Sequence, residues 1–456
     1  MKSKRFNVII SHKIKPFRKT IVVDSDKSQS IRAFLIGSIS HNISTAKNVL
    51  ESDDVLSTIN CLKKLNVKIV KKSSKNYEIY GKGLGSFFCK KNTLLDLGNS
   101  GTGLRLLCSI LATTPNIDLK LTGDSSLKKR NMSKLIKLMN EFGAEFFPKK
   151  KYFLPLRMVS SEMPIGINFT AGVSSQIKSA VVLAGLNSYG KTVITENEKS
   201  RDHTENILSN SSDVIKIKNI LKKKRIITIF GKKFLKPINI NIPGDPSSAA
   251  FFAALTLLNK NSFLKIKNVG LNPTRVGFFE IMKNAGAKII FKNIKKKINE
   301  PFGDIYIKSS KLKPLRISKK LYVKSVDEFP IMFVIAAMTP GVSILEVDSE
   351  NLKNKESDRI IEMKKILKQI GVRCLVSKDK IKIFGKSQLQ LKNKIIIVPD
   401  LNDHRICMSA FILGLLGFKS KIKNFNTQVN SSSPSFLKIS KYIGGKFEIK
   451  QLKIFQ

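Results

Sequence analysis

The chain has 456 residues and a formal net charge of +49, because 82 lysines and arginines stand against 33 acidic residues. This length fits two to four domains of roughly 100–200 residues. Hydrophobic residues make up 42% and charged residues 25% of the chain, which excludes a largely disordered or fibrous protein. Only 13 of the 82 cations are arginines, and the 69 lysines are spread through every segment. Such scatter is typical of a solvated surface, and there is no Trp to stack on bases.

Cysteine usage and apolar runs indicate the compartment. The five cysteines are odd in number, widely spaced and without a CxxC pair, which favours a reducing environment. The N-terminus lacks the apolar core and cleavage site of a signal peptide. The longest apolar stretch, Ile406 to Phe418, falls short of the ~20 residues that span a bilayer. We therefore expect a cytoplasmic protein with no membrane segment.

One pattern recurs six times along the chain: a short polar cluster, an apolar run of helical length, and a Gly or Asn turn. The copies lie at residues 25–40, 98–112, 174–187, 244–260, 326–341 and 402–417. Their anchors, Ser28, Thr102, Ser175, Ser247, Asp327 and His404, are separated by 74, 73, 72, 80 and 77 residues. A period held this closely predicts a repeat architecture. Because each first helix is apolar nearly all round, we expect it to be buried.

A second, amphipathic helix follows each first one. These helices are predicted to end at Asn66, Gly143, Gly286, Gly371 and Gly444, and the third copy ends less clearly near Asp213. The β-branched runs between helices include residues 68–70, 226–230, 305–307 and 395–398. Each repeat is therefore an α/β module of about 70 to 80 residues with two helices.

The polar starts of the first helices are candidate anion sites, because backbone N–H groups and the helix dipole attract negative charge there. Any one start can be an ordinary cap. Seven of the 13 arginines nevertheless lie at or beside these starts, and Arg is the planar, bidentate donor to carboxylates and phosphates. They are Arg32, Arg105, Arg130, Arg201, Arg275, Arg359 and Arg405.

Several of these residues also have a plain structural reading. Asp327 and Asp403 can act simply as helix caps, residues 355–359 can form a salt-bridged solvated helix, and His404 can be structural or catalytic. The remaining histidines, His12, His41 and His203, have no ligand spacing with cysteines or carboxylates. We therefore predict no metal site.

The motifs match one family in order over nearly the whole chain. They are Lys27-Ser28-x-Ser30-x-Arg32, Leu97-Gly-Asn99-Ser-Gly101-Thr-Gly-Leu-Arg105, Ser174-Ser-Gln176, Gly244-Asp-Pro-Ser-Ser248, Asn272-Pro-Thr-Arg275, Asp327-Glu328-x-Pro, Lys355-Glu-Ser-Asp-Arg359 and Asp403-His-Arg405. Together they resemble the 3-phosphoshikimate 1-carboxyvinyltransferase, or EPSP synthase, family. Residues 174–187 and 201–205 are similar to its class II-like members, which tend toward tolerance of the inhibitor glyphosate.

The resemblance implies an α/β fold, a two-domain inside-out α/β barrel with six copies of a βαβαββ unit, three per domain. One domain would comprise residues 24–243, and the other residues 1–23 plus 244–456. The active site would lie in the cleft between them, with hinges near Val23-Asp24 and Pro243-Gly244.

The implied reaction transfers the enolpyruvyl group of phosphoenolpyruvate to the 5-hydroxyl of shikimate 3-phosphate and releases phosphate, in aromatic amino-acid (chorismate) biosynthesis. By motif, Glu356 is the proton donor, Asp327 the proton acceptor, and Lys27 lies between both substrates. Phosphoenolpyruvate would be bound by Lys27, Gly101, Arg130, Gln176, Arg359 and Arg405. Shikimate 3-phosphate would be bound by Lys27, Ser28, Arg32, Ser174, Ser175, Gln176, Arg201, Asp327, Asn351 and Lys355. The resemblance implies no metal or organic cofactor, no nucleic-acid or membrane partner, and a monomer that glyphosate inhibits at the phosphoenolpyruvate site.

Two segments depart from the family pattern. Asp24-Ser25 stands where Pro-Gly is usual, and Ser431-Ser-Ser433-Pro434 stands where many members carry Lys-Thr-Phe-Pro. The second departure leaves one cationic contact to phosphoenolpyruvate unassigned.

Two other functions remain open from the sequence. The related UDP-N-acetylglucosamine enolpyruvyl transferase shares the fold and the donor but uses a cysteine on a mobile loop, whereas Cys108 and Cys407 lie in apolar helical runs. A basic nucleic-acid-binding protein would explain the charge. It would not explain the acids Asp327, Glu356 and Asp403 at or near helix starts.

Overall fold

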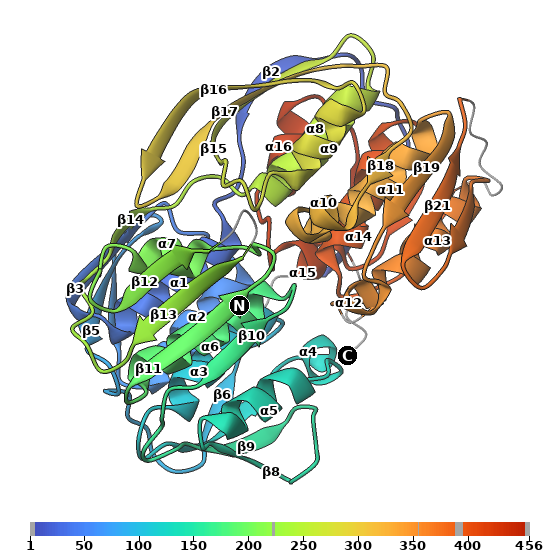
Figure 1. Ribbon diagram of the computed structural model, residues 1–456. Helices are drawn as coiled ribbons and strands as arrows, with labels where there is room; N and C mark the ends of the chain where they lie inside the picture. Colours follow the sequence, from blue (N-terminus) through green and yellow to red (C-terminus); the bar gives the residue numbers. More distant parts are fainter. Residues whose placement is uncertain (1–4, 221–223, 354, 388–394, 452–456) are drawn as a thin grey trace. The chain divides into compact units, whose positions relative to one another are not determined.

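The computed structural model describes residues 5–220, 224–353, 355–387 and 395–451. They fold into two compact units (Figure 1). The N-terminal unit comprises Ser25–Pro243 and Lys296–Glu300, and the C-terminal unit comprises the described residues before Ser25, Gly244–Lys295, and those from Pro301 onward. Asp24 and residues 296–300 therefore fall on the other side of the division expected from the sequence. Their hydrogen bonds explain this, because Asp24 bonds to Ser433 and Glu300 to His203.

The N-terminal unit carries helices and strands in the repeating order expected from the sequence. Its elements are α1 (Lys27–Ile39), β3 (His41–Lys47), α2 (Asp53–Lys64), β4 (Lys68–Ser73), β5 (Asn76–Lys82), β6 (Thr93–Asp96), α3 (Gly101–Ala112), β7 (Asp118–Thr122), α4 (Ser125–Lys128), α5 (Ser133–Glu141), β8 (Glu145–Phe147), β9 (Leu156–Val159), β10 (Asn168–Ala171), α6 (Ser175–Asn187), β11 (Lys191–Glu196), α7 (His203–Leu208), β12 (Ile215–Asn219), β13 (Arg225–Phe230) and β14 (Asn239–Asn241).

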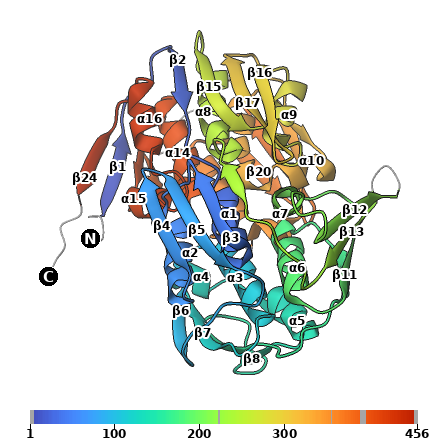
Figure 2. The ribbon, with the colours of Figure 1, turned by 90° about the vertical axis from the view of Figure 1, so that its left-hand side faces the viewer.

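The C-terminal unit begins with two strands from the start of the chain, β1 (Phe6–Ile10) and β2 (Arg18–Val22). Its further elements are α8 (Pro246–Leu258), β15 (Phe263–Gly270), α9 (Gly277–Asn284), β16 (Lys288–Lys297), β17 (Glu300–Lys308), β18 (Arg316–Ile317), α10 (Lys319–Lys324), η1 (Val326–Glu328), α11 (Phe329–Met338), β19 (Gly341–Glu346), α12 (Ser349–Lys353), α13 (Arg359–Gln369), β20 (Arg373–Val376), β21 (Lys380–Gly385), β22 (Ile396–Val398), α14 (His404–Leu415), β23 (Ser420–Ile422), α15 (Phe425–Val429), α16 (Phe436–Tyr442) and β24 (Glu448–Gln451). Strands β1 and β24, from opposite ends of the chain, pair side by side (Figure 2).

The described strands form six four-stranded sheets of one topology. Their orders are β14-β3-β5-β4, β6-β7-β9-β8 and β10-β11-β13-β12 in the N-terminal unit, and β2-β15-β17-β16, β18-β19-β21-β20 and β22-β23-β1-β24 in the C-terminal unit. In each sheet the first two strands are parallel and the second pairs antiparallel with the third. This topology confirms the predicted architecture of six βαβαββ repeats in an inside-out α/β fold.

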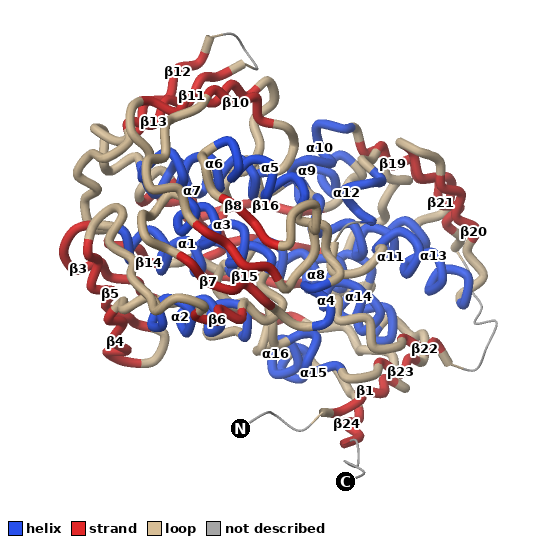
Figure 3. The backbone as a smooth tube through the Cα atoms, turned by 90° about the horizontal axis from the view of Figure 1, so that it is seen from below, coloured by secondary structure: helices blue, strands red, loops and turns tan. Residues whose placement is uncertain are grey.

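The first helix of each repeat is buried, as its uniformly apolar sequence predicts. In the N-terminal unit α3 packs on α1 and α6, and in the C-terminal unit α8, α11 and α14 pack on one another. The sheets lie outside these helices, as β3, β4 and β5 do beside α1 and α2 in Figure 3. Each unit therefore has its own hydrophobic core.

The predicted ends of the second helices are confirmed by backbone geometry. The residues after these helices have positive φ: 62° at Asn66, 91° at Gly143, 93° at Gly286, 72° at Gly371 and 104° at Gly444. Gly and Asn tolerate this left-handed conformation, which terminates a helix. The third repeat differs: its second helix is α7, which has only six residues and ends at Leu208, before the predicted end near Asp213.

Candidate functional site

The start of α1 carries two of the predicted binding residues, Lys27 and Ser28. Lys27 is the first helical residue, and its ammonium lies 2.8 Å from the Asp54 carboxylate at the start of α2. The Lys27 side chain is 16% exposed, so solvent reaches it. Ser28 follows and is half-buried. Lys27 is therefore a cation at a helix N-terminus that already has an internal counter-ion.

Arg32, one turn further along α1, is buried and held by hydroxyl groups of two other helices. Its Nε donates to Thr204 Oγ1 at 2.8 Å, and Nη2 donates to Ser179 Oγ at 3.1 Å. Nη1 donates to the Ser28 carbonyl at 3.1 Å. These contacts hold the Arg32 guanidinium against the backbone of Ser28, so the structure brings these two predicted residues together.

Four buried charged residues form a cluster next to the residues that hold Arg32. Lys178 on α6 is fully buried, with its ammonium 2.9 Å from Glu196 and 2.7 Å from Glu205. Arg225 also pairs with Glu196, and with Glu205 at 3.2 Å. Burial raises the pKa of Glu196, but Lys178 and Arg225 outweigh that effect, so the net pKa lies below its usual value.

The charge cluster was not predicted as part of the site. Lys178 and Glu205 neighbour Ser179 and Thr204, the two hydroxyl partners of Arg32. The cluster therefore fixes the α6 and α7 residues that hold Arg32. The available signal was Lys178 itself, a single charge within an apolar helix.

Two guanidinium groups flank Gly101, the first residue of α3. A Cβ built on Gly101 would lie 2.7 Å from Arg130 Nη1 and 2.9 Å from Arg105 Nη1. Arg105 donates to the Gln176 side-chain carbonyl at 3.0 Å. Gln176 in turn donates to Thr102 Oγ1 at 2.9 Å. Arg105 also donates to the Gly101 carbonyl at 3.1 Å, so it joins Gly101 to Gln176, two of the residues predicted for phosphoenolpyruvate. The sequence reasoning left Arg105 without a role in the site.

Arg130 retains donor capacity toward a ligand. Its Nη2 bonds to Asn99 and, at 3.3 Å, to Ser126. Its Nε is buried and has no hydrogen-bond partner among the described residues. A buried guanidinium N–H without an acceptor is costly unless a bound anion supplies one.

The remaining predicted residues of this unit lie at helix starts. Ser174 caps α6 by accepting a hydrogen bond from the Ile177 N–H at 3.4 Å, and Ser175 is the first residue of that helix. Arg201 precedes α7 and is half-buried. These positions fit the expectation that polar caps line an anion site.

In the C-terminal unit, Arg359 at the start of α13 pairs with three carboxylates. Its guanidinium lies 2.9 Å from Asp403, 2.6 Å from Glu356 and 3.7 Å from Asp327. Burial alone lowers the pKa of Arg359, but Asp403, Glu356 and Asp327 outweigh it and raise that pKa well above its ordinary value. Three carboxylates thus share this one guanidinium. The structure therefore brings the predicted acid and base together around a permanently charged group.

The three carboxylates differ in access. Asp403 is fully buried, caps α14 through the Arg405 N–H at 2.9 Å, and also accepts from Ser357 Oγ at 3.0 Å. The Asp327 and Glu356 side chains are 20% and 18% exposed. Asp403 therefore anchors Arg359, whereas the other two can reach a ligand.

Arg405 follows on α14 and is 4% exposed. Its guanidinium lies 5.8 Å from the centre of the Phe251 ring. Its Nη1 is buried without a hydrogen-bond partner in the described part of the chain. Lys355 is half-buried just before α13. Asn351 lies on α12, but its side chain is outside the described residues.

A second buried network joins the starts of α8 and α11. Arg275 donates to Asp245 and to Ser247 Oγ, both at 2.9 Å. Ser247 Oγ donates to Glu328. Arg275, one of the seven arginines noted at the repeat starts, therefore forms its hydrogen bonds with residues of the C-terminal unit.

The cysteines and the candidate metal ligands bear on two kinds of chemistry, thiol catalysis and metal binding. All five cysteines are buried, and burial raises the pKa of the Cys108 thiol to about 12. Across the described ranges, no three His, Cys, Asp or Glu side chains gather as metal ligands. No helix in the described part of the chain is both long and apolar enough to cross a membrane.

Comparison with known proteins identifies the family. The model of the family described as EPSP synthase (3-phosphoshikimate 1-carboxyvinyltransferase) matches residues 11–438. The 3-phosphoshikimate 1-carboxyvinyltransferase of Zymomonas mobilis is 36% identical over 448 residues, covering 98% of each chain. That of Caldicellulosiruptor bescii is 39% identical over 396 residues, covering 86% of this chain and 89% of the relative.

Solved structures agree with this match. A structure of EPSP synthase from Acinetobacter baumannii superposes with a TM-score of 0.81 at 32% identity, covering 98% of this chain and 100% of that one. The enolpyruvyl transferase NikO from Streptomyces tendae, with a TM-score of 0.74 at 12% identity and the same coverage, shows the shared fold alone. The chain therefore belongs to the EPSP synthase (3-phosphoshikimate 1-carboxyvinyltransferase) family.

Proposed function

We propose that this protein transfers the enolpyruvyl group of phosphoenolpyruvate to the 5-hydroxyl of shikimate 3-phosphate, giving 5-enolpyruvylshikimate 3-phosphate and phosphate. The names of its full-length relatives support this activity. The observation that carries it is the Arg359 cluster, in which two accessible carboxylates, Asp327 and Glu356, share one buried guanidinium.

The charge of this cluster suits a reaction that moves protons. When the phosphoenolpyruvate carboxylate binds Arg359, it brings negative charge close to the Asp327 and Glu356 carboxylates, which pair with the same guanidinium. Proton uptake by Glu356 then relieves the repulsion. Substrate binding thereby favours the protonated form of Glu356, which the first step needs as its acid.

In the addition step, Glu356 donates its proton to the methylene carbon of phosphoenolpyruvate, which becomes a methyl group. The 5-oxygen of shikimate 3-phosphate bonds to the adjacent carbon, and Asp327 accepts the hydroxyl proton. In the elimination step the methyl group returns a proton to the Glu356 carboxylate, the bond from carbon to the phosphate oxygen breaks, and phosphate departs. The double bond is thereby restored in the product.

Cations neutralise the two polyanionic substrates. We assign phosphoenolpyruvate to Lys27, Gly101, Arg130, Gln176, Arg359 and Arg405. The buried, unpartnered Nε of Arg130 and Nη1 of Arg405 support this assignment. We assign shikimate 3-phosphate to Lys27, Ser28, Arg32, Ser174, Ser175, Gln176, Arg201, Asp327, Asn351 and Lys355.

The proposal includes no metal or organic cofactor, and it places a monomeric enzyme in the cytoplasm. The test is phosphate release from phosphoenolpyruvate with shikimate 3-phosphate or UDP-N-acetylglucosamine as acceptor. We expect turnover with the first acceptor only, because the five cysteines are buried and the related transferase needs an accessible one. Turnover with UDP-N-acetylglucosamine alone would overturn the assignment.

A further inference from the structure

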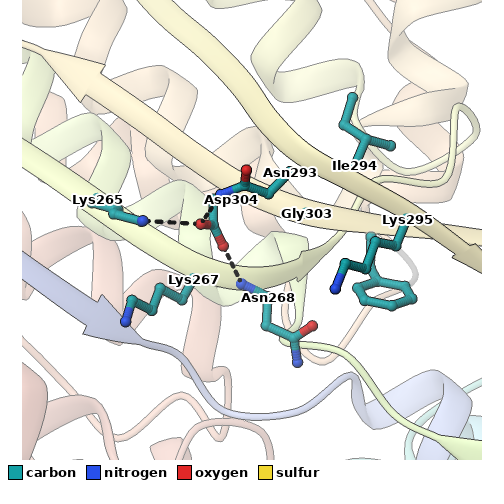
Figure 4. Close-up of a pocket in the computed structure, with 9 residues that line it drawn as sticks. Lys265, Lys267, Asn268, Asn293, Ile294, Lys295, Gly303 and Asp304 are labelled. Atoms are coloured by element: carbon teal, nitrogen blue, oxygen red, sulfur yellow. Dashed lines mark hydrogen bonds and ion pairs between the residues drawn. The ribbon is translucent and has the colours of Figure 1, made fainter.

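A hollow of about 490 Å³ lies on the β2-β15-β17-β16 sheet of the C-terminal unit (Figure 4). Its lining comes from three strands and contains none of the residues assigned to catalysis or substrate binding. The lining residues are Lys265, Lys267, Asn268, Asn293, Ile294, Lys295, Phe302, Gly303 and Asp304. This volume fits a small molecule.

On one side of the hollow lies the Asp304 carboxylate, whose hydrogen-bond and ion-pair partners come from the same sheet. The Asp304 carboxylate lies 3.0 Å from the Lys265 ammonium and accepts from the Asn293 amide at 2.9 Å. It also accepts from the Asn268 N–H at 3.1 Å. Burial raises the pKa of Asp304, but these hydrogen bonds outweigh it and hold the pKa below its usual value. Asp304 thus remains ionised, and Lys265 offsets its charge.

The other side carries two cations without internal counter-ions. Lys267 and Lys295 are exposed, and neither has an ion pair within the described ranges. The register of β15 shifts between Ile266 and Val269, and Asn268 has φ of 53°. Such a bulge redirects side chains. In Figure 4, Lys267, Asn268 and Lys295 accordingly point to the same side, with Asn268 between the two lysines.

We infer that this hollow binds a small polyanion of the condensed-phosphate class, with Lys267 and Lys295 as its charged contacts and the Asn268 amide between them. Three lysines against one aspartate give the lining a formal charge of +2. Lysine ammonium groups bind phosphate oxygens as point charges, so two of them on either side of an amide donor suit a ligand with two phosphoryl groups. The concave shape favours a small ligand over an extended polymer.

Isothermal titration calorimetry with inorganic pyrophosphate, at constant ionic strength, tests the site in the full chain. Saturating shikimate 3-phosphate and glyphosate are included to occupy the proposed catalytic site. The variants are Lys267→Gln and Lys295→Gln. The control is Lys288→Gln, which removes the same charge from an exposed lysine on β16 outside the hollow.

We expect one pyrophosphate per chain. The dissociation constant should rise about fivefold or more in each hollow variant, as expected for a lost charge-assisted contact, and less than about twofold in the control. Equal weakening in all three variants would mean a general charge effect and overturn the site. Loss of wild-type binding when shikimate 3-phosphate and glyphosate are present would also overturn it, because pyrophosphate would then occupy the catalytic site. Turnover of the hollow variants should match wild type, so this result is separate from the proposed function.

Discussion

The Ser433 hydroxyl donates a hydrogen bond to the Asp24 carboxylate at 2.9 Å, and both side chains are buried. The Ser435 N–H donates to the same carboxylate oxygen, also at 2.9 Å. Asp24 and Ser433 lie in the two segments that depart from the family motifs. The departures are therefore one structural feature: the serine segment supplies the donors that a buried carboxylate at position 24 requires.

Ser433→Ala should destabilise the C-terminal unit by about 1–3 kcal/mol, because it removes a donor from a buried charged acceptor. Ser431→Ala is the matched control, since Ser431 Oγ donates to the Gln428 carbonyl of α15 and not to a carboxylate. Urea unfolding compares the two variants. If Ser433→Ala were no more destabilising than Ser431→Ala, the hydrogen bond from Ser433 to Asp24 would not contribute to the stability of the C-terminal unit.

Glu356→Gln and Asp327→Asn should each lower turnover by about 10²–10⁴, the usual effect of losing a positioned acid or base. Each amide keeps nearly the same shape, so binding of shikimate 3-phosphate should change little. Glu362→Gln is the control, because Glu362 lies on α13 but pairs with Lys365. Steady-state phosphate release gives the comparison, and wild-type turnover in either acid variant would remove its assigned role.

Gly101→Ala should raise the KM for phosphoenolpyruvate more than it lowers kcat. The new methyl group would lie within 3.0 Å of Arg130 and Arg105, so both guanidinium groups must move. Glyphosate is longer than the substrate, and we expect its inhibition to weaken further, by about 10-fold or more. Inhibition constants and KM values measured on both forms test this. Unchanged values for substrate and inhibitor would show that Gly101 does not border the ligand.

Acid should weaken the N-terminal unit through Glu196. Its folded-state pKa lies below the ordinary 4.5, because Lys178 and Arg225 outweigh burial. The stabilisation is therefore complete above pH 4.5 and is lost as pH falls through the lowered folded-state pKa. Glu196→Gln should unfold more easily at neutral pH and show a smaller further loss below pH 4.5. Glu198→Gln, an exposed neighbour, should behave as wild type. An unaltered acid profile in Glu196→Gln would contradict this.

The sequence predicted the helices well because their signals are local. Polar caps such as Ser174, apolar runs, and turn residues such as Gly143 and Asn66 specify where each helix begins and ends. The period of these signals predicted six repeats. It could not predict that residues 296–300 belong to the N-terminal unit, since that depends on the distant pair of His203 and Glu300.

The candidate site was predicted by motif, but its buried support was not. Lys178 finds its carboxylates on β11 and α7, and Arg359 is anchored by Asp403 at the start of α14. These partners are far apart in sequence, and no local pattern pairs them. The roles of Asp327, Glu356 and the binding residues remain predictions that the variants above test.

The most direct test of the account is the reaction run in D₂O with phosphoenolpyruvate and shikimate 3-phosphate, followed by proton NMR of the product. Addition of a solvent-derived proton to the methylene carbon, followed by elimination from a methyl group, must place deuterium in the vinyl methylene of the product. We predict deuterated 5-enolpyruvylshikimate 3-phosphate with the wild-type enzyme, formed about 10²–10⁴ times more slowly by Glu356→Gln. Product whose methylene carries no deuterium, or no product at all, would contradict the account.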